Sequence, residues 1–183
     1  MPFYLFLVKL IDSDNPTITR ILSLPSTLNF IQLHVVLQIA FGWQAEHAWR
    51  FAIKGSPVAF DGHPVQDGEH HYHKVHGRPK MWEETLMNLT SRDVAMSPSY
   101  PREYNSADTK LSHVFDKPEW RNKGVRAVYT YDFGDNWAHE ITFLGISDTS
   151  LIRAFNATTP PSKVPEKPFF TCVAGEVRFV LRL

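Results

Sequence analysis

The sequence predicts a single α+β domain, residues 1–183, in which a mostly antiparallel sheet packs against a few helices. At 183 residues the chain is long enough for one sizeable hydrophobic core and short for two ordinary domains. Short runs of β-branched and aromatic residues, each bounded by turn-forming residues, are typical of hairpin strands. One longer run carries apolar residues at helical spacing. These patterns together favour the α+β class.

The N-terminal segment predicts a β-hairpin. Residues 3–11 are rich in Phe, Tyr, Leu, Val and Ile, and the Asp, Ser, Asn and Pro residues that follow at 12–16 are typical of a turn. The β-branched and apolar run 17–24 then stops at Pro25. We therefore expect this second run to pair back onto the first.

The next segment predicts a helix that ends at Gly42. Ser26 or Thr27 can supply its N-terminal cap, and glycine suits the left-handed conformation that is common just after a helix. The apolar positions that set the helical period are Leu28, Ile31, Val35 and Ile39.

Two histidines in and after this helix are candidate binding residues. His34 and Gln38 lie four residues apart on one helical face, where a buried polar pair must find hydrogen-bond partners, so a structural role is the simpler hypothesis for His34. Residues 45–52 alternate with the period of a strand. This alternation places His47 on the same face as Trp49.

The middle of the chain is less regular. Residues 55–80 are rich in Gly, Pro, Asp and His and predict a long loop. His71 and His73 are weaker metal candidates within it, because imidazole suits zinc, copper or nickel but their spacing is not specific. We expect a short amphipathic helix over residues 81–96 and a helical turn over 109–115.

The stretch YTYDFGDNWAH, residues 129–139, predicts a second hairpin, with the turn at Gly134, Asp135 and Asn136. If Asp135 and Asn136 form a two-residue loop, Asp132 lies opposite His139. If Gly134 and Asp135 form the loop instead, Asp132 faces the tryptophan at 137. In the first register, Asp132, Asp135 and His139 are candidate acid/base residues, although a structural turn is favoured.

Bulk properties limit the function classes. The 19 basic and 19 acidic residues cancel, so no strong charge signal favours nucleic-acid binding. The single cysteine excludes an internal disulfide and any multi-cysteine zinc site. No apolar run is long enough for a membrane helix, and the N-terminus lacks the features of a signal peptide. We expect an intracellular, cytoplasmic protein that has no membrane partner.

Two blocks of the sequence resemble the plasmid pRiA4b ORF-3-like family. The first is LPSTLNFIQLHVVLQIAFGWQAEHAWRF at 24–51, and the second is YTYDFGDNWAHEITFLG at 129–145. The family motif positions that carry over are His34, Trp43, His47 and Phe51 in the first block, and Tyr131, Asp132, Phe133, Gly134, Asp135, Trp137 and His139 in the second.

The resemblance implies a compact α+β domain with a strongly curved sheet, an association with mobile elements and no established activity. The chain departs from the family in two places. Ile18 stands where a tryptophan is expected. CVAGE at 172–176 is followed by VRFVLRL instead of an acidic continuation rich in Pro and Gly. We therefore expect the C-terminal part from about residue 177 to be divergent or truncated.

Three functions remain open. A non-catalytic binding or scaffold domain is favoured, and its candidate binding residues are His34, Trp43, His47, Tyr131 and Trp137. The second is a divalent-metal-dependent hydrolase, such as a phosphoesterase or nuclease-like enzyme, with the metal candidates His34, His47, Asp132 and His139. The third is a DNA accessory protein of a mobile element. Substrate and partner remain undetermined by the sequence.

Overall fold

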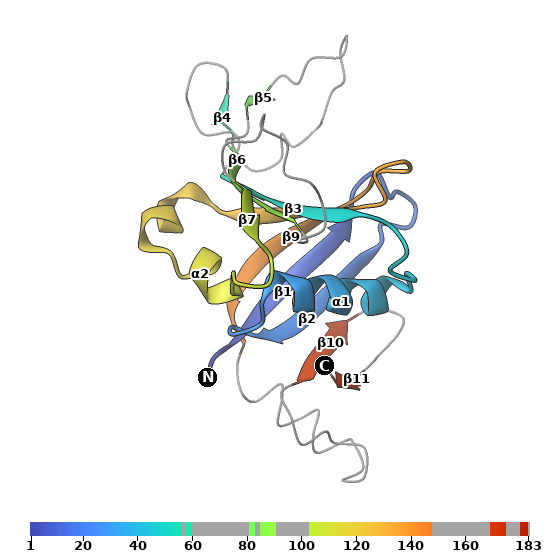
Figure 1. Cartoon of the computed structure of the whole chain (residues 1–183), viewed down its shortest axis with the longest axis horizontal. Helices are drawn as coiled ribbons and strands as arrows, with labels where there is room; N and C mark the ends of the chain where they lie inside the picture. Colours follow the sequence, from blue (N-terminus) through green and yellow to red (C-terminus); the bar gives the residue numbers. More distant parts are fainter. Residues whose placement is uncertain are drawn as a thin grey trace.

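A computed structural model describes residues 1–55, 58–59, 81–82, 85–90, 103–147, 169–174 and 180–182. Nine of the described strands form one sheet in the order β11-β10-β2-β1-β9-β8-β3-β6-β7 (Figure 1). Its strands are β1 (Phe3–Leu10), β2 (Thr19–Pro25), β3 (Trp49–Lys54), β6 (Thr85–Thr90), β7 (Glu103–Asn105), β8 (Arg126–Tyr131), β9 (Trp137–Ile146), β10 (Phe169–Ala174) and β11 (Val180–Arg182). The other elements are β4 (Val58–Ala59), which pairs with β5 (Met81–Trp82), and α1 (Phe30–Phe41), α2 (Leu111–Phe115) and the 3-10 helix η1 (Pro118–Lys123).

The expected α+β class is confirmed, and so is a mostly antiparallel sheet. Only β6 and β7 run parallel among the neighbouring strands of the nine-stranded sheet. The strong curvature implied by the family resemblance is wrong, because the sheet stays open between its edge strands β11 and β7 and is not strongly curved.

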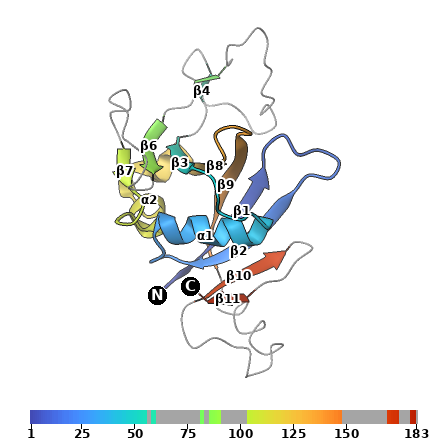
Figure 2. The same ribbon diagram turned by 45° about the vertical axis from the view of Figure 1, so that its right-hand side comes forward.

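Helix α1 packs on one face of the central strands, as Figures 1 and 2 show from two directions. Its side chains meet the strands directly: the ring centroids of the buried Phe30 and Phe51 are 5.1 Å apart, and those of the partly buried Phe41 and of His139 are 4.5 Å apart. Val35, expected on the apolar face, is 38% exposed. The helix is apolar almost all round, so its sequence did not specify which face is buried.

The ends of α1 agree with the sequence at one terminus only. Gly42 adopts the left-handed conformation, with φ of 75°, and ends the helix as predicted. The prediction that Ser26 or Thr27 caps the helix is wrong. Asn29 caps the helix instead: its Oδ1 accepts a hydrogen bond from the Gln32 backbone N–H at 2.8 Å, and Gln32 Oε1 accepts from the Asn29 N–H at 3.0 Å. This reciprocal pair is a capping box.

Some of the remaining predicted elements are confirmed and one is wrong. β1 and β2 form the expected antiparallel hairpin, and α2 lies within the helical turn expected over 109–115. The helix expected over 81–96 is wrong where the chain is described, because residues 85–90 form β6 and pair with β3. Pairing with a neighbouring strand satisfies the backbone there and overrides the amphipathic pattern. Residues 91–96 lie outside the described residues.

Candidate functional site

Three loops meet at one end of the sheet. They are the β1–β2 turn (11–18), the segment between α1 and β3 (42–48) and the β8–β9 turn (132–136), all on the right of Figure 1. Backbone hydrogen bonds connect them: the N–H of Ile11 donates to the Ala138 carbonyl at 2.8 Å, and the N–H of Asp132 donates to the Ala48 carbonyl at 3.0 Å. Both motif blocks of the sequence therefore contribute to this end.

The signature hairpin has neither of the two registers expected from the sequence. Tyr131 pairs with Trp137 and Tyr129 pairs with His139, so the turn takes five residues, 132–136. Asp132 has a left-handed φ of 56°, a conformation that Asp and Asn tolerate better than most residues. Because Asp132 lies in the turn, the expected cross-strand pair with His139 does not form.

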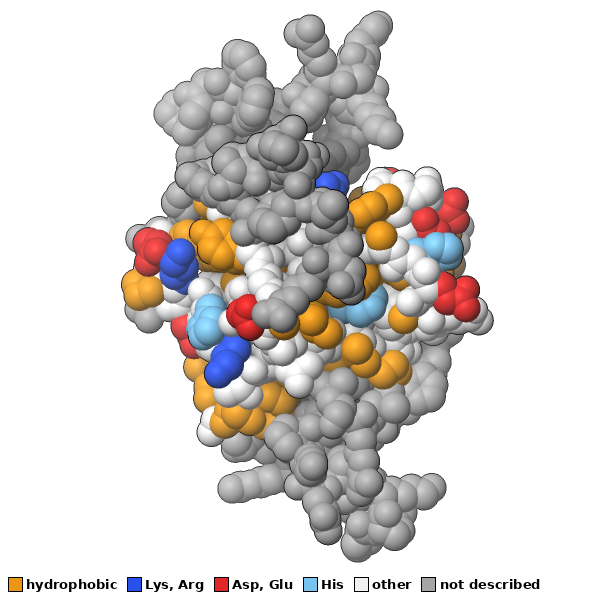
Figure 3. All heavy atoms as spheres, viewed as in Figure 1, with side chains coloured by type: hydrophobic (Ala, Val, Ile, Leu, Met, Phe, Trp, Pro, Cys, Tyr) orange, Lys and Arg blue, Asp and Glu red, His pale blue; other side chains and the backbone are white. Residues whose placement is uncertain are grey.

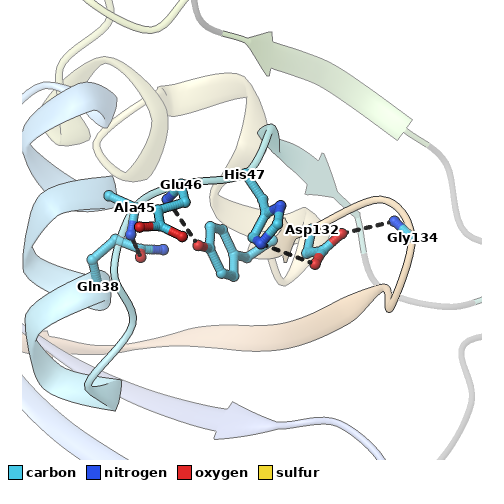
Figure 4. A network of polar contacts seen from close by, with 7 residues as sticks. Gln38, Ala45, Glu46, His47, Asp132 and Gly134 are labelled. Atoms are coloured by element: carbon cyan, nitrogen blue, oxygen red, sulfur yellow. Dashed lines mark hydrogen bonds and ion pairs between the residues drawn. The ribbon is translucent and has the colours of Figure 1, made fainter.

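The Asp132 side chain has two roles in this turn (Figure 4). Its Oδ1 accepts a hydrogen bond from the Gly134 backbone N–H at 2.9 Å, which closes an Asx turn. Its Oδ2 lies 3.6 Å from Nε2 of His47. This distance is longer than a good hydrogen bond, and the His47 side chain is 54% exposed. The histidine partner of Asp132 is therefore His47, from the other motif block.

A buried polar network holds α1 against β8. The Tyr129 hydroxyl accepts a hydrogen bond from Nε2 of Gln38 at 2.7 Å and lies 2.8 Å from Nδ1 of His34. Since the hydroxyl oxygen accepts from Gln38, its proton is available for Nδ1, and His34 then carries its own proton on Nε2. Gln38 Oε1 accepts from the Ala45 backbone N–H at 2.8 Å, which extends the network into the 42–48 loop.

The environment of this network keeps its groups neutral. Burial lowers the pKa of His34 to about 4 and raises the pKa of Tyr129. The His34 ring also stacks on Trp49, with centroids 4.3 Å apart. The structural role expected for His34 agrees with this geometry.

His139 lies on the inner face of β9 and is fully buried. Its ring meets Phe41 and Tyr129, with centroid separations of 4.5 and 5.5 Å. Burial lowers its pKa to about 4, although the backbone carbonyls of Tyr129 and Trp137 partly offset this effect. Neither ring nitrogen makes a well-aligned hydrogen bond within the described part of the chain. His139 is consequently a neutral member of an aromatic cluster.

Aromatic side chains of the two motif blocks pack against one another near the hairpin tip. The Trp43 ring lies 5.5 Å from that of Tyr131 and 5.3 Å from that of Trp137, centroid to centroid. Trp137 is 39% exposed and Phe133 is 48% exposed. The Arg50 guanidinium lies over the Phe133 ring at 5.7 Å from its centroid.

The structure thus separates the predicted site residues into two groups. Trp43, His47, Tyr131, Asp132 and Trp137 come together at the loop end, and Asp135 is exposed on the turn. His34 and His139 point into the core. No group of three or more His, Cys, Asp or Glu side chains that could hold a metal occurs among the residues the structure describes. His71 and His73 lie outside those residues.

Sequence reasoning missed Tyr129 and Glu46. The Tyr129 hydroxyl joins the two polar residues of α1, and the Glu46 backbone N–H donates to the Tyr131 hydroxyl at 3.1 Å. One signal could have found Tyr129. It alternates with Tyr131 along one strand, so both side chains share the buried face.

Comparison with known proteins places the chain in a family. A family model for plasmid pRiA4b ORF-3-like protein matches residues 3–162. The chain belongs to this family. The pRiA4b ORF-3-like signature in this chain is therefore the pair of motif blocks that meet at the loop end, and the plasmid origin in the family's name agrees with the expected link to mobile elements. No curated protein matches the chain significantly.

A solved structure supports the fold of this pRiA4b ORF-3-like chain. It is the crystal structure of a protein of unknown function from Methanosarcina mazei Go1, with a TM-score of 0.52 and 18% identity over 93% of this chain and 68% of that one. At this identity the likeness concerns the fold alone. In the described part of the pRiA4b ORF-3-like chain, no helix has the length and apolar character needed to cross a membrane.

The Asx turn predicts a difference between two substitutions of Asp132. Asp132→Asn keeps an oxygen that can accept from the Gly134 N–H and keeps a residue that tolerates φ of 56°. We expect it to change the free energy of unfolding by less than about 0.5 kcal/mol. Asp132→Ala removes that acceptor and adds left-handed strain, so we expect a loss of about 1–2 kcal/mol. Urea denaturation of both variants measures the difference, and equal losses would contradict the Asx turn.

Proposed function

We propose that this chain is a non-catalytic binding domain, and that it holds its partner at the loop end formed by segments 42–48 and 132–136. One observation carries the proposal: in the core, His34 is engaged with Tyr129, whereas His47, Phe133 and Trp137 are exposed at the loop end. Exposed aromatic side chains on a rigid frame are typical of binding surfaces.

The geometry supports a metal-dependent hydrolase less well. His34 and His139, two of the four main metal candidates, are buried among aromatic rings and both contact Tyr129. The remaining pair, His47 and Asp132, offers only two side chains, whereas a catalytic zinc needs three protein ligands and an open position. A DNA accessory role finds no support at this end, because its loops carry carboxylates and no Lys or Arg.

Site-specific photo-crosslinking in cells tests the proposal. A benzoylphenylalanine probe placed at Phe133 or Trp137 should give discrete crosslinked products. The same probe at Tyr104, an equally exposed aromatic residue on β7, is the matched control and should give none of those products. Absence of products from Phe133 and Trp137, or the same products from all three positions, would contradict binding at the loop end.

A further inference from the structure

The loop end carries a strong charge asymmetry. Segments 11–18, 42–48 and 132–136 contain five carboxylates and no Lys or Arg, although the whole chain has 19 residues of each sign. The five carboxylates belong to Asp12, Asp14, Glu46, Asp132 and Asp135. Acidic side chains and a histidine gather on the right of Figure 3, at the end where the three loops lie. Their summed field favours a positively charged partner.

Two basic side chains that flank these loops, those of Arg20 and Arg50, are already engaged. Arg20 donates from Nε to the Ala40 carbonyl at 3.0 Å and from Nη1 to the Thr19 carbonyl at 2.8 Å. The Arg50 guanidinium lies over Phe133. Lys9 is exposed on β1, in register with Glu140 on β9. These cations sit on the strands and leave the carboxylates of the loop tips without a neutralising Lys or Arg in the loops themselves.

The aromatic side chains of the same end suit a cation chemically. The face of an aromatic ring attracts a guanidinium or ammonium group, and the contact between Arg50 and Phe133 is one example within this chain. Trp137 presents an exposed tryptophan, the ring type with the strongest cation–π attraction, between Trp43 and solvent. An aromatic ring offers a contact surface to a cationic side chain of a partner, and a carboxylate at the same end attracts its charge.

We propose that the loop end binds an Arg- or Lys-bearing polypeptide segment, with its cations on Trp137 and among the five carboxylates. This inference rests on the proposed binding function and names its partner class. A polypeptide fits better than a metal ion, because the carboxylates are spread over three loops and no metal-holding group occurs within the described residues. A polypeptide can place several Lys or Arg side chains next to carboxylates of different loops at the same time. A nucleic acid would meet like charge.

Fluorescence anisotropy with the full-length chain tests the inference. The probe is a labelled nine-residue peptide of alternating Arg and Gly, and its counterpart carries Glu in place of Arg. We expect binding of the Arg peptide that weakens as salt rises, and no binding of the Glu peptide. Asp12→Asn, Asp14→Asn and Asp135→Asn should each weaken binding about two- to threefold at low salt, and Trp137→Leu about two- to fivefold.

Matched controls separate this surface from nonspecific attraction. Glu119→Gln removes one exposed carboxylate on η1, and Tyr104→Leu removes one exposed ring on β7; both should leave the affinity for the Arg peptide unchanged. Phe133→Leu is the alternative aromatic variant if Trp137→Leu does not fold, as judged by its thermal melt. The inference would be overturned if the control variants lost as much affinity for the Arg peptide as the loop variants. It would also be overturned if no loop substitution changed that affinity.

The outcomes also distinguish this inference from the function on which it rests. Crosslinked products from Phe133 together with no affinity for the Arg peptide would overturn the inference that the partner is cationic. They would still support the proposed binding function. Duplex DNA or the Glu peptide bound more tightly than the Arg peptide, with loss on Trp137→Leu, would likewise overturn the inference of a cationic partner. Failure of the crosslinking itself would overturn the binding function.

Discussion

Tyr129→Phe should be the most destabilising single-atom deletion in the motif blocks, lowering the free energy of unfolding by about 2–3 kcal/mol. The substitution keeps the ring in the core and removes only the hydroxyl. That hydroxyl is the partner of both His34 Nδ1 and Gln38 Nε2. Its loss leaves two buried polar groups without hydrogen bonds, and each such group costs free energy. Urea denaturation monitored by tryptophan fluorescence measures the effect.

Two other tyrosines serve as controls for this prediction. Tyr131→Phe removes a hydroxyl that accepts a hydrogen bond from the Glu46 backbone N–H at 3.1 Å. Tyr131 is buried, but Glu46 is exposed, so water can satisfy that N–H after the substitution, and we expect a loss of about 1 kcal/mol or less. Tyr104→Phe alters an exposed residue and should be neutral. A loss at Tyr129 no greater than that at Tyr131 would show that the network does not hold α1 to β8.

Acidification from pH 7 to 5 should destabilise the fold through His34 and His139. Burial lowers the pKa of each from 6.5 to about 4. The unfolded chain therefore binds more protons between these values, and stability rises with pH across this window. The stabilisation is fully present above about pH 6.5 and is lost as the pH falls through about 4. Each histidine should contribute about 2 kcal/mol of the change between pH 7 and 5.

Single substitutions assign this pH dependence to its residues. His139→Leu and His34→Gln each remove one buried imidazole, so each variant should show a smaller change in unfolding free energy between pH 7 and 5 than the parent chain. His47→Gln is the control, because the side chain of His47 is mostly exposed. Urea titrations at the two pH values provide the comparison. An unchanged pH dependence in both core variants would show that these imidazoles are not the groups that titrate on unfolding.

Local chemistry was enough to predict several elements. The turn residues at 12–16 and the β-branched run after them produce the β1–β2 hairpin, and Gly42 ends α1 because a left-handed residue is needed there. The same reasoning failed for the start of α1. Asn29, Ser26 and Thr27 are all good caps, but only Asn29 is followed three residues later by a glutamine, Gln32, which is the spacing of a capping box. The prediction of Ser26 or Thr27 overlooked this signal.

The candidate site was predictable in composition and not in pairing. The resemblance of both motif blocks identified Trp43, His47, Tyr131, Asp132 and Trp137, and the structure assembles these at one end. One of the two expected registers paired Asp132 with His139 and the other placed it opposite Trp137, and neither forms, because a shift of register in the β8–β9 hairpin changes which side chains are opposite each other. The five-residue turn moves Asp132 out of the ladder and toward the loop that precedes β3.

The sequence by itself determined the α+β class, the strand–strand–helix order of the first 42 residues, and the residues of the pRiA4b ORF-3-like signature. Propensity, turn chemistry and periodicity act over a few neighbouring residues, so a linear pattern records them. Only the tertiary structure decided that His34 and His139 are buried and neutral, and that the exposed His47 lies beside the partly buried Asp132. Burial and side-chain partners depend on contacts between segments about 90 residues apart in the chain, which local patterns do not encode.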